Sequence, residues 1–406
     1  MLLFSCAYKP AIERKIASAS CSCNGQSDDT NCLRDLFLNN QQVELANDQV
    51  CTSTRPLTLG NGASVRGQGA TIRFALTEGS TAFNITGSDV LLSDLNVIYK
   101  PNGPRQANAV IRLSENVSRV RISNNHIQAS GSYQGILSEK ARNTQITISG
   151  NTIENTTYGI LVNAHHLGPD PAEYQSGWVI EKNRIVKNNG DAIEINSPIG
   201  KKRTPAMSMR DFRIVDNELE AAGGKTAGAG FCLGVAGLHN AVIAGNIMSR
   251  CKWQCIHIED HSGNILVQNN QCLGTIGPKP NDKTRWAAND SSGIILLGTV
   301  HDIRVLDNEL SDTAGFGIEL TGSSRERAYT SNIVVAGNKI TRAGTHAIFV
   351  GGDAGVRLDS LVGPSHGFPG NTTVDSGKPQ GSLPAGQGSI LQNGGENVII
   401  QDNSGN

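Results

Sequence analysis

Short segments of alternating aliphatic and polar residues recur along the chain, each followed by Asn, one further residue and then Ile or Leu. Clear copies are VRISNNHI at 120–127, FRIVDNEL at 212–219 and IRVLDNEL at 303–310. Alternation with a period of two predicts a strand with one face in a core. The marked residues recur every 24 to 38 positions and are Asn125, Asn151, Asn183, Asn217, Asn246, Asn270, Asn308 and Asn338.

A second strand follows most copies and has the form small residue, Ile, variable residue, aliphatic residue. Examples are AIEI at 192–195, CIHI at 255–258 and GIEL at 317–320. Alternation directs the two aliphatic side chains inward and the variable one outward. Two or more short strands per repeat predict a parallel β-helix whose stacked coils bury one core. We expect the Asn column at a bend, where Asn tolerates left-handed backbone and bonds to its copy in the next coil.

The composition supports one long solenoid. The chain has 406 residues, of which 46 are Gly and only 4% are aromatic. No Pro-rich or charge-rich linker divides it, so residues 25–406 are predicted to be a single domain. Residues 1–24 are predicted to be a leader or flexible N-terminus, and residues 25–55 an N-terminal cap. Residues 351–397 break the repeat and predict a long surface loop or a C-terminal cap.

Charge and hydropathy exclude two classes of partner. A formal net charge of −1 gives no overall field that would recruit nucleic acid or an anionic membrane. No apolar run approaches the roughly 18 residues needed to span a bilayer. The apolar start MLLFSCAY, followed rather than preceded by basic residues, predicts either an unusual export signal or a disordered leader. The sequence leaves the oligomeric state open.

Eight of the nine cysteines form two clusters. The cluster at residues 21–51 suits a disulfide-pinned cap, with Cys32–Cys51 as the expected pair. In the cluster at 232–272, Cys232 and Cys255 occupy equivalent repeat positions, where we expect small apolar filler residues. Zinc is disfavoured because Cys251 and Cys255 have no second pair at finger spacing. The cap disulfide predicts an extracytoplasmic location, periplasmic or secreted.

These features resemble the right-handed parallel β-helix superfamily of pectate-lyase-like proteins and phage tailspikes. GQSDDTNCLRDLF at 25–37 looks like the family's capping helix, which Asp28 or Asp29 can N-cap. NGDAIEIN at 189–196, GFCLGVAG at 230–237 and CIHIED at 255–260 look similar to a subgroup that includes the β-helix protein of colanic-acid exopolysaccharide clusters. The resemblance implies an all-β, right-handed parallel β-helix with a short N-terminal capping helix, and a polysaccharide context. Ile195 departs from the subgroup's Trp.

Two outward columns place candidate chemistry on three consecutive coils. The first column holds Glu194, Gly234 and His257, and the second holds Asn196, Ala236 and Glu259. Adjacent parallel strands lie about 4.8 Å apart, so the outer coils of the three are about 9–10 Å apart. The small residues between them predict a shallow trough, which suits an extended glycan.

Two carboxylates across a trough suit glycoside hydrolysis. Glu194 and Glu259 are the predicted pair, one protonating the leaving oxygen and the other activating water. His257 would orient a carboxylate or act as the acid, and Asp191 would support the pair. The plain alternative is that both glutamates are solvated surface residues.

Further residues around the trough are predicted to bind substrate. They are Gly234, Asn196, Asp260, His261, the loop cations Lys201, Lys202 and Arg203, and Trp253. The cations would hold sugar carboxylates, or simply be solvated, and Trp253 would stack on a sugar ring or close the core. No spaced ligand set predicts a cofactor, although Asp191, Asp216 and Asp260 offer oxygen ligands for Ca²⁺.

The sequence therefore predicts a glycoside hydrolase that cleaves a bacterial, acidic exopolysaccharide. A polysaccharide lyase is the second hypothesis, in which His257 or a Lys removes the proton α to a uronate carboxylate. A non-catalytic glycan-binding or exopolysaccharide assembly protein is the third.

Overall fold

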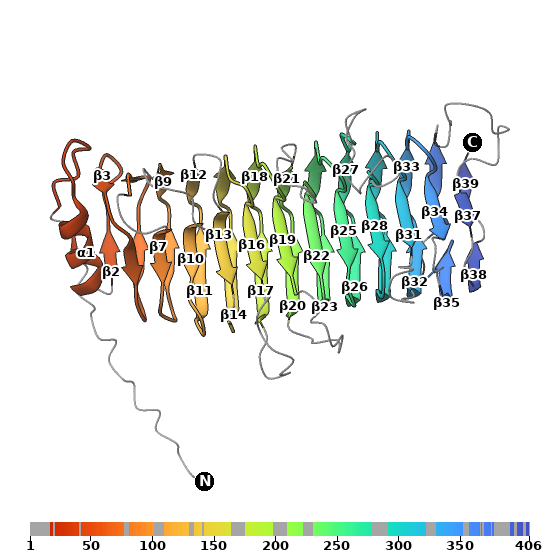
Figure 1. Cartoon of the computed structure of the whole chain (residues 1–406), viewed down its shortest axis with the longest axis horizontal. Helices are drawn as coiled ribbons and strands as arrows, with labels where there is room; N and C mark the ends of the chain where they lie inside the picture. Colours follow the sequence, from red (N-terminus) through yellow and green to blue (C-terminus); the bar gives the residue numbers. More distant parts are fainter. Residues whose placement is uncertain are drawn as a thin grey trace, which may run out of the picture.

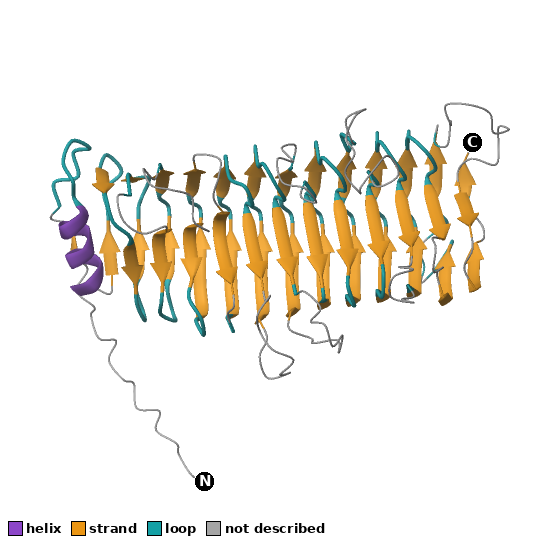
Figure 2. Cartoon of the chain, viewed as in Figure 1, coloured by secondary structure: helices purple, strands orange, loops and turns teal. Residues whose placement is uncertain are grey.

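Three long parallel sheets wind around one core in this computed structural model (Figure 1). Counted over the described residues, sheet A has 14 strands, from β1 (Ala17–Ser18) to β38 (Glu396–Ile400). Counted in the same way, sheet B has 13, from β3 (Val50–Ser53) to β39 (Ser404–Gly405), and sheet C has 12, from β4 (Leu57–Leu59) to β37 (Ile390–Asn393). The chain visits A, B and C in turn and then starts the next coil. Strands dominate (Figure 2), and the predicted right-handed parallel β-helix with one short N-terminal helix is confirmed.

The structure describes most of the chain, with gaps at the termini and at several internal segments. The described residues are 17–18, 21–39, 42–76, 81–100, 109–129, 134–139, 142–163, 175–197, 209–221, 230–277, 291–321, 330–351, 357–365, 367, 369–374, 376, 390–393, 396–400 and 403–405.

One coil illustrates how the sequence pattern becomes structure. It runs through β20 (Met209–Val215) in sheet A, β21 (Glu218–Glu220) in sheet B and β22 (Leu233–Ala236) in sheet C. Ile214, Leu219 and Val235 point inward and are at most 2% exposed. Stacking the same aliphatic positions in every coil produces one continuous core, because no single coil can bury its own apolar face.

The asparagine column forms a ladder inside the corner between sheets A and B. The backbone N–H of Asn217 and its side-chain amide both donate to Oδ1 of Asn246, at 3.0 and 2.9 Å. The predicted bond between coils is therefore confirmed. The left-handed backbone belongs instead to the residue before each rung, such as Asp216 (φ 56°). That residue makes the turn, which leaves the Asn side chain free to point inward.

The solenoid continues through the segment predicted to be a loop or cap. Residues 351–397 contribute β35 (Arg357–Val362), β36 (Thr372–Val374) and β37. Asn371 and Asn403 add further rungs to the ladder. The repeat was hidden in the sequence because Gly-rich stretches separate these short strands.

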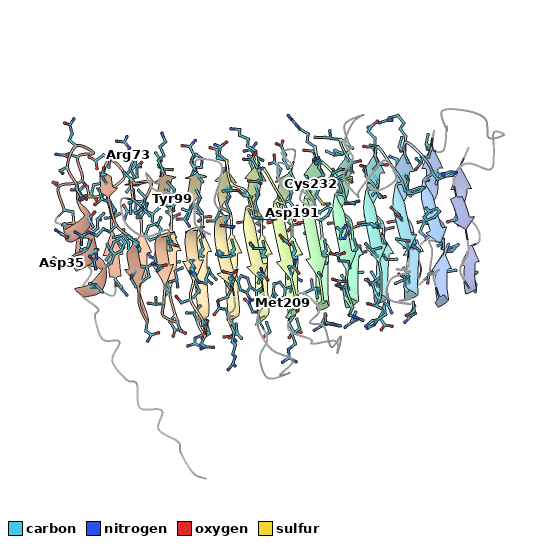
Figure 3. The ribbon with its side chains drawn as sticks, viewed as in Figure 1. Asp35, Arg73, Tyr99, Asp191, Met209 and Cys232 are labelled. Atoms are coloured by element: carbon cyan, nitrogen blue, oxygen red, sulfur yellow. A yellow bond between two sulfur atoms is a disulfide. The ribbon has the colours of Figure 1, made fainter. Side chains whose placement is uncertain are left out.

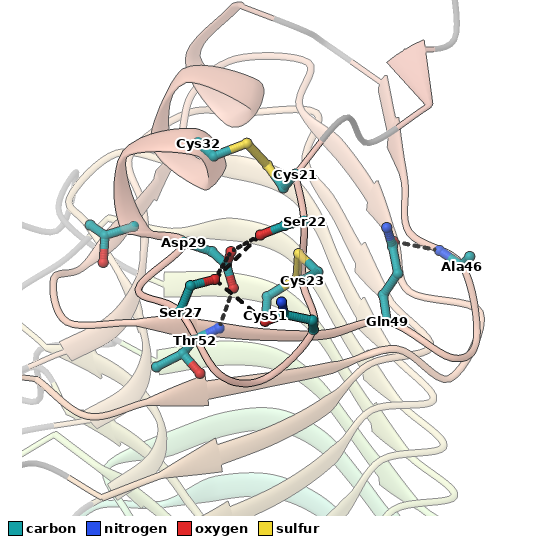
Figure 4. The surroundings of a disulfide bond; sticks show 12 residues. Cys21, Ser22, Cys23, Ser27, Asp29, Cys32, Ala46, Gln49, Cys51 and Thr52 are labelled. Carbon is teal, nitrogen blue, oxygen red and sulfur yellow. Dashed lines mark hydrogen bonds between the residues drawn. A yellow bond between two sulfur atoms is a disulfide. The ribbon is translucent and has the colours of Figure 1, made fainter.

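The N-terminal cap is held by helix α1 (Thr30–Asn39) and two disulfides (Figure 4). Asp28 accepts a hydrogen bond of 3.0 Å from the N–H of Thr30, the first helical residue. The disulfides are Cys21–Cys32 and Cys23–Cys51, so the predicted Cys32–Cys51 pair is wrong. Because Cys21 and Cys23 are bonded to the cap, residues 1–24 are not wholly a free leader.

The second cysteine cluster also forms disulfides, Cys232–Cys251 and Cys255–Cys272. The prediction of filler residues is therefore wrong. Each bond joins the start of a sheet C strand to the sheet B side of the following coil. Cys232 and Cys255 lie at the same corner of consecutive coils because they occupy equivalent repeat positions. Each is bonded to a cysteine of the next coil, Cys251 and Cys272 respectively. These disulfides link consecutive coils next to the candidate site.

Candidate functional site

Sheet C carries the two predicted columns in the predicted register. Glu194 of β19 (Ile193–Asn196) is aligned with Gly234 of β22, which is aligned with His257 of β25 (Ile256–Glu259). The second column aligns Asn196, Ala236 and Glu259 in the same way. Asp191 immediately precedes this face, near the middle of the solenoid (Figure 3).

The predicted open floor between the two sides is filled. The ring of Phe231 stacks on His257, with centroids 4.4 Å apart and planes inclined by 25°. A Cβ atom at Gly234 would lie 3.2 Å from this ring and 3.8 Å from Oδ2 of Asp191. The glycine therefore admits the aromatic ring and the carboxylate rather than leaving a trough, which corrects its predicted role as a binding surface.

Glu259 forms an ion pair with a buried histidine. Its Oε2 lies 3.2 Å from Nε2 of His257, whose side chain is only 2% exposed. Burial raises the pKa of Glu259, but the charge of His257 and its hydrogen bond more than offset this, so the pKa is lowered from its ordinary value. Glu259 thus favours the ionised form.

Glu194 is shifted in the opposite direction. Burial raises its pKa, and the nearby charge of Glu259 adds to the shift. A hydrogen bond of 2.9 Å from the Asn196 amide opposes this only in part. The two predicted carboxylates are therefore driven toward different protonation states, which is how paired acids acquire separate roles.

Asp191 is a buried third carboxyl group. Its Oδ1 accepts hydrogen bonds from the backbone N–H groups of Gly230 and Phe231, at 2.5 and 2.8 Å. Burial, followed by the charge of Glu194, raises the pKa of Asp191 well above its ordinary value despite these bonds. Asp191 anchors the segment that carries Phe231, so its role includes positioning.

Tyr158 belongs to this cluster and was missed in the sequence. Burial and then the charges of Glu194 and Asp191 raise the pKa of its phenol, so it keeps its proton. Tyr158 occupies the position just before the small residue that opens each sheet C strand. That position forms a third column, which contains Tyr158, Asp191, Phe231, Gln254, Ser292, Phe316 and His346.

Members of this third column reach toward the variable position of the following coil. Phe231 contacts His257 in this way, Ser292 donates a hydrogen bond of 2.5 Å to Glu319, and Phe316 stacks on Phe349. Aligning the residue that precedes the small residue of each sheet C strand would have revealed this third column in the sequence.

The remaining predicted residues have different outcomes. Trp253 is only 1% exposed and the Lys252 ammonium lies 4.7 Å from its ring centroid, so the ring is not open to stack on a sugar. Asp260 and His261 occupy the turn after β25, both with left-handed backbone. The predicted cations Lys201, Lys202 and Arg203 lie outside the described residues.

The suggested Ca²⁺ ligands do not come together. Asp216 lies at the corner between sheets A and B, whereas Asp191 precedes a sheet C strand and Asp260 follows one. Another group of close potential ligands among the described residues is Cys23, Asp29 and Cys51. Both cysteines are bonded to each other, so this group serves the cap.

Comparisons with known proteins agree on the architecture. The family model described as a right handed beta helix region matches residues 214–361. By its fold, this chain is a right-handed parallel β-helix. No curated protein sequence matches it. Within the described residues, no helix has the length and apolar character required to cross a membrane.

Several solved structures share this β-helix at low sequence identity. The periplasmic alginate epimerase AlgG, in a double-mutant form, has a TM-score of 0.58 and 12% identity, covering 87% of this chain and 78% of that one. The Dettilon tailspike protein has a TM-score of 0.54 and 14% identity, covering 89% and 68%. The Streptococcus pneumoniae surface adhesin PfbA has a TM-score of 0.51 and 12% identity, covering 96% and 91%.

Proposed function

We propose that this β-helix is a secreted or periplasmic glycoside hydrolase that cleaves an acidic bacterial exopolysaccharide. The observation that carries the proposal is the opposite shift of the pKa values of Glu194 and Glu259 on one face of sheet C. In this mechanism Glu194 is the general acid that protonates the leaving oxygen. Glu259, kept ionised by His257, is the general base that activates water.

The spacing of the pair favours an inverting reaction. Their Cα positions are separated by two strands, about 10 Å, and by two residues, about 7 Å along the strand. Glutamate side chains can shorten this separation to the 6.5–9.5 Å or so that leaves room for a water molecule, whereas retaining enzymes need about 5 Å.

Four disulfides fit an oxidising compartment outside the cytoplasm. An alginate epimerase and a tailspike share the fold, which supports a carbohydrate context without selecting a reaction. A surface adhesin also shares it, which keeps non-catalytic glycan binding as a second candidate. A lyase would require His257 or a Lys, rather than a carboxylate, to remove the substrate proton.

The test is incubation with a panel of acidic exopolysaccharides, followed by mass analysis of the products. Hydrolysis adds one water per cleavage, whereas a lyase leaves an unsaturated sugar that absorbs in the ultraviolet. Glu194→Gln and Glu259→Gln should each cut cleavage by about 10²–10⁴-fold. Glu139→Gln is the matched control, because Glu139 lies in the second column four coils before Glu259. Full cleavage by both site variants, or polymer binding without cleavage by the parent protein, would overturn the proposal.

A further inference from the structure

Three histidines gather at the corner where the chain passes from sheet C to sheet A. His239 lies in β23 (Leu238–Ala244), His301 opens β29 (His301–Leu306), and His261 precedes β26 (Gly263–Gln268). In the sheet register, His239 is aligned with Gly263, and Gly263 with His301. The three histidines therefore come from three successive coils, and His239 and His301 flank one glycine.

The glycine lets two of the rings approach each other. A Cβ atom at Gly263 would lie 2.7 Å from Nε2 of His301, so the imidazole occupies the space above the glycine. The ring centroids of His239 and His301 are 6.0 Å apart. Any larger residue at position 263 would separate these rings.

Each ring has a feature that suits a metal ligand. His239 is 9% exposed, and its buried Nε2 has no hydrogen-bond partner. The Nε2 atom of His261 is also buried.

His301 is oriented by a carboxylate. Its Nδ1 lies 2.7 Å from Oδ2 of Asp302, and this contact holds the ring over Gly263. A histidine whose second nitrogen is held by a carboxylate is the usual arrangement around protein-bound zinc. On the other side of His239, Arg210 is aligned with it and approaches Asp211 at 3.6 Å, so this cation has its own acidic neighbour.

We propose that His239, His261 and His301 bind one divalent transition-metal ion, with Zn²⁺ the best fit, and that Asp302 positions His301. Imidazole nitrogens suit zinc, copper and nickel, whereas Ca²⁺ and Mg²⁺ prefer oxygen ligands. As the three rings lie, one nitrogen from each does not fall within 4.8 Å of the other two. Rotation of the side chains must therefore draw the nitrogens in to the roughly 2.0–2.1 Å zinc–nitrogen distance. The ion would tie three coils together at this corner, and a fourth position would remain for water.

The proposal is tested on untagged, chelator-treated full-length protein by calorimetric titration with ZnCl₂. We expect one ion per chain and no saturable binding of Mg²⁺. His301→Ala should weaken zinc binding by about 100-fold or more, and Asp302→Asn by about 10–100-fold. The matched control is His126→Ala, because His126 is 46% exposed by side chain and pairs with Glu154; it should bind as the parent does.

Thermal unfolding separates metal loss from misfolding. The His301 side chain is 43% exposed, so His301→Ala should unfold at the parent's temperature in chelator. Zinc should then raise the unfolding temperature of the parent but not of this variant. Absence of saturable zinc binding by the parent overturns the proposal. An unchanged zinc affinity in the His239→Ala, His301→Ala double variant would place the ion elsewhere and would also overturn the proposal.

Discussion

The ring of Phe231 lies 4.4 Å, centroid to centroid, from the imidazole of His257 and covers Gly234. This contact keeps His257 dry beside Glu259. We expect Phe231→Ala to lower the free energy of unfolding by about 3 kcal/mol, as measured by urea denaturation. It should also admit water to His257, which weakens the ion pair between His257 and Glu259. The acidic limb of the kcat/KM profile should then move to higher pH.

Phe349→Ala is the control for this variant. Phe349 stacks on Phe316 at 4.7 Å in the same sheet, but away from Glu194. Phe349 is only partly buried, so this variant should lose less stability, and it should leave the pH profile unchanged. Identical pH profiles for the two variants would show that Phe231 acts only in folding.

The opposite pKa shifts predict a bell-shaped dependence of kcat/KM on pH. Activity requires ionised Glu259 and protonated Glu194. Since the pKa of Glu259 is lowered from 4.5 and that of Glu194 is raised from 4.5, the acidic limb falls below that value and the alkaline limb above it.

Glu194→Gln should cut polymer cleavage by about 10²–10⁴-fold. On an aryl glycoside, whose leaving group needs no acid, the Glu194→Gln variant should lose only the alkaline limb of its pH profile. If the alkaline limb survives on this substrate, the general acid is a group other than Glu194.

Replacement of Asp191 by Asn should stabilise the protein at neutral pH. The folded-state pKa of Asp191 is raised, so its contribution to stability is present at low pH and is lost as the pH rises through that pKa. Asn keeps an oxygen for the N–H groups of Gly230 and Phe231 without the buried charge. We expect an unfolding temperature higher by roughly 1–3 °C at pH 8 and unchanged near pH 3, measured by calorimetry. A variant less stable than the parent at pH 8 would contradict this.

The disulfide between Cys232 and Cys251 spans 19 residues and joins neighbouring coils. Replacing both by Ser should cost about 2–4 kcal/mol of unfolding free energy, measured by urea denaturation without reductant. Cys6→Ser, the cysteine outside both clusters, is the control. Peptide mapping under non-reducing conditions that found Cys232 joined to another cysteine would refute the assignment.

Much of the fold could be read from the sequence because a solenoid repeats one local rule. The Asn rungs, the inward aliphatic pairs and the register of Glu194 with His257 all follow from aligning copies. The repeat also placed Cys232 and Cys255 at equivalent corners. It could not pair them, because their partners Cys251 and Cys272 come from the next coil, where only the turn geometry brings the sulfurs together.

The sequence by itself determined which residues share the site face, since strand alternation and coil stacking fix each column. Only the tertiary structure decided that this face is filled by Phe231, that Trp253 is buried and that Tyr158 joins the carboxylates. Those outcomes depend on how the loop residues before each sheet C strand lie across the following coil. Such contacts form where a glycine leaves room for a neighbouring side chain, as Gly234 and Gly263 do. The repeat pattern in the sequence does not show which side chain occupies that room.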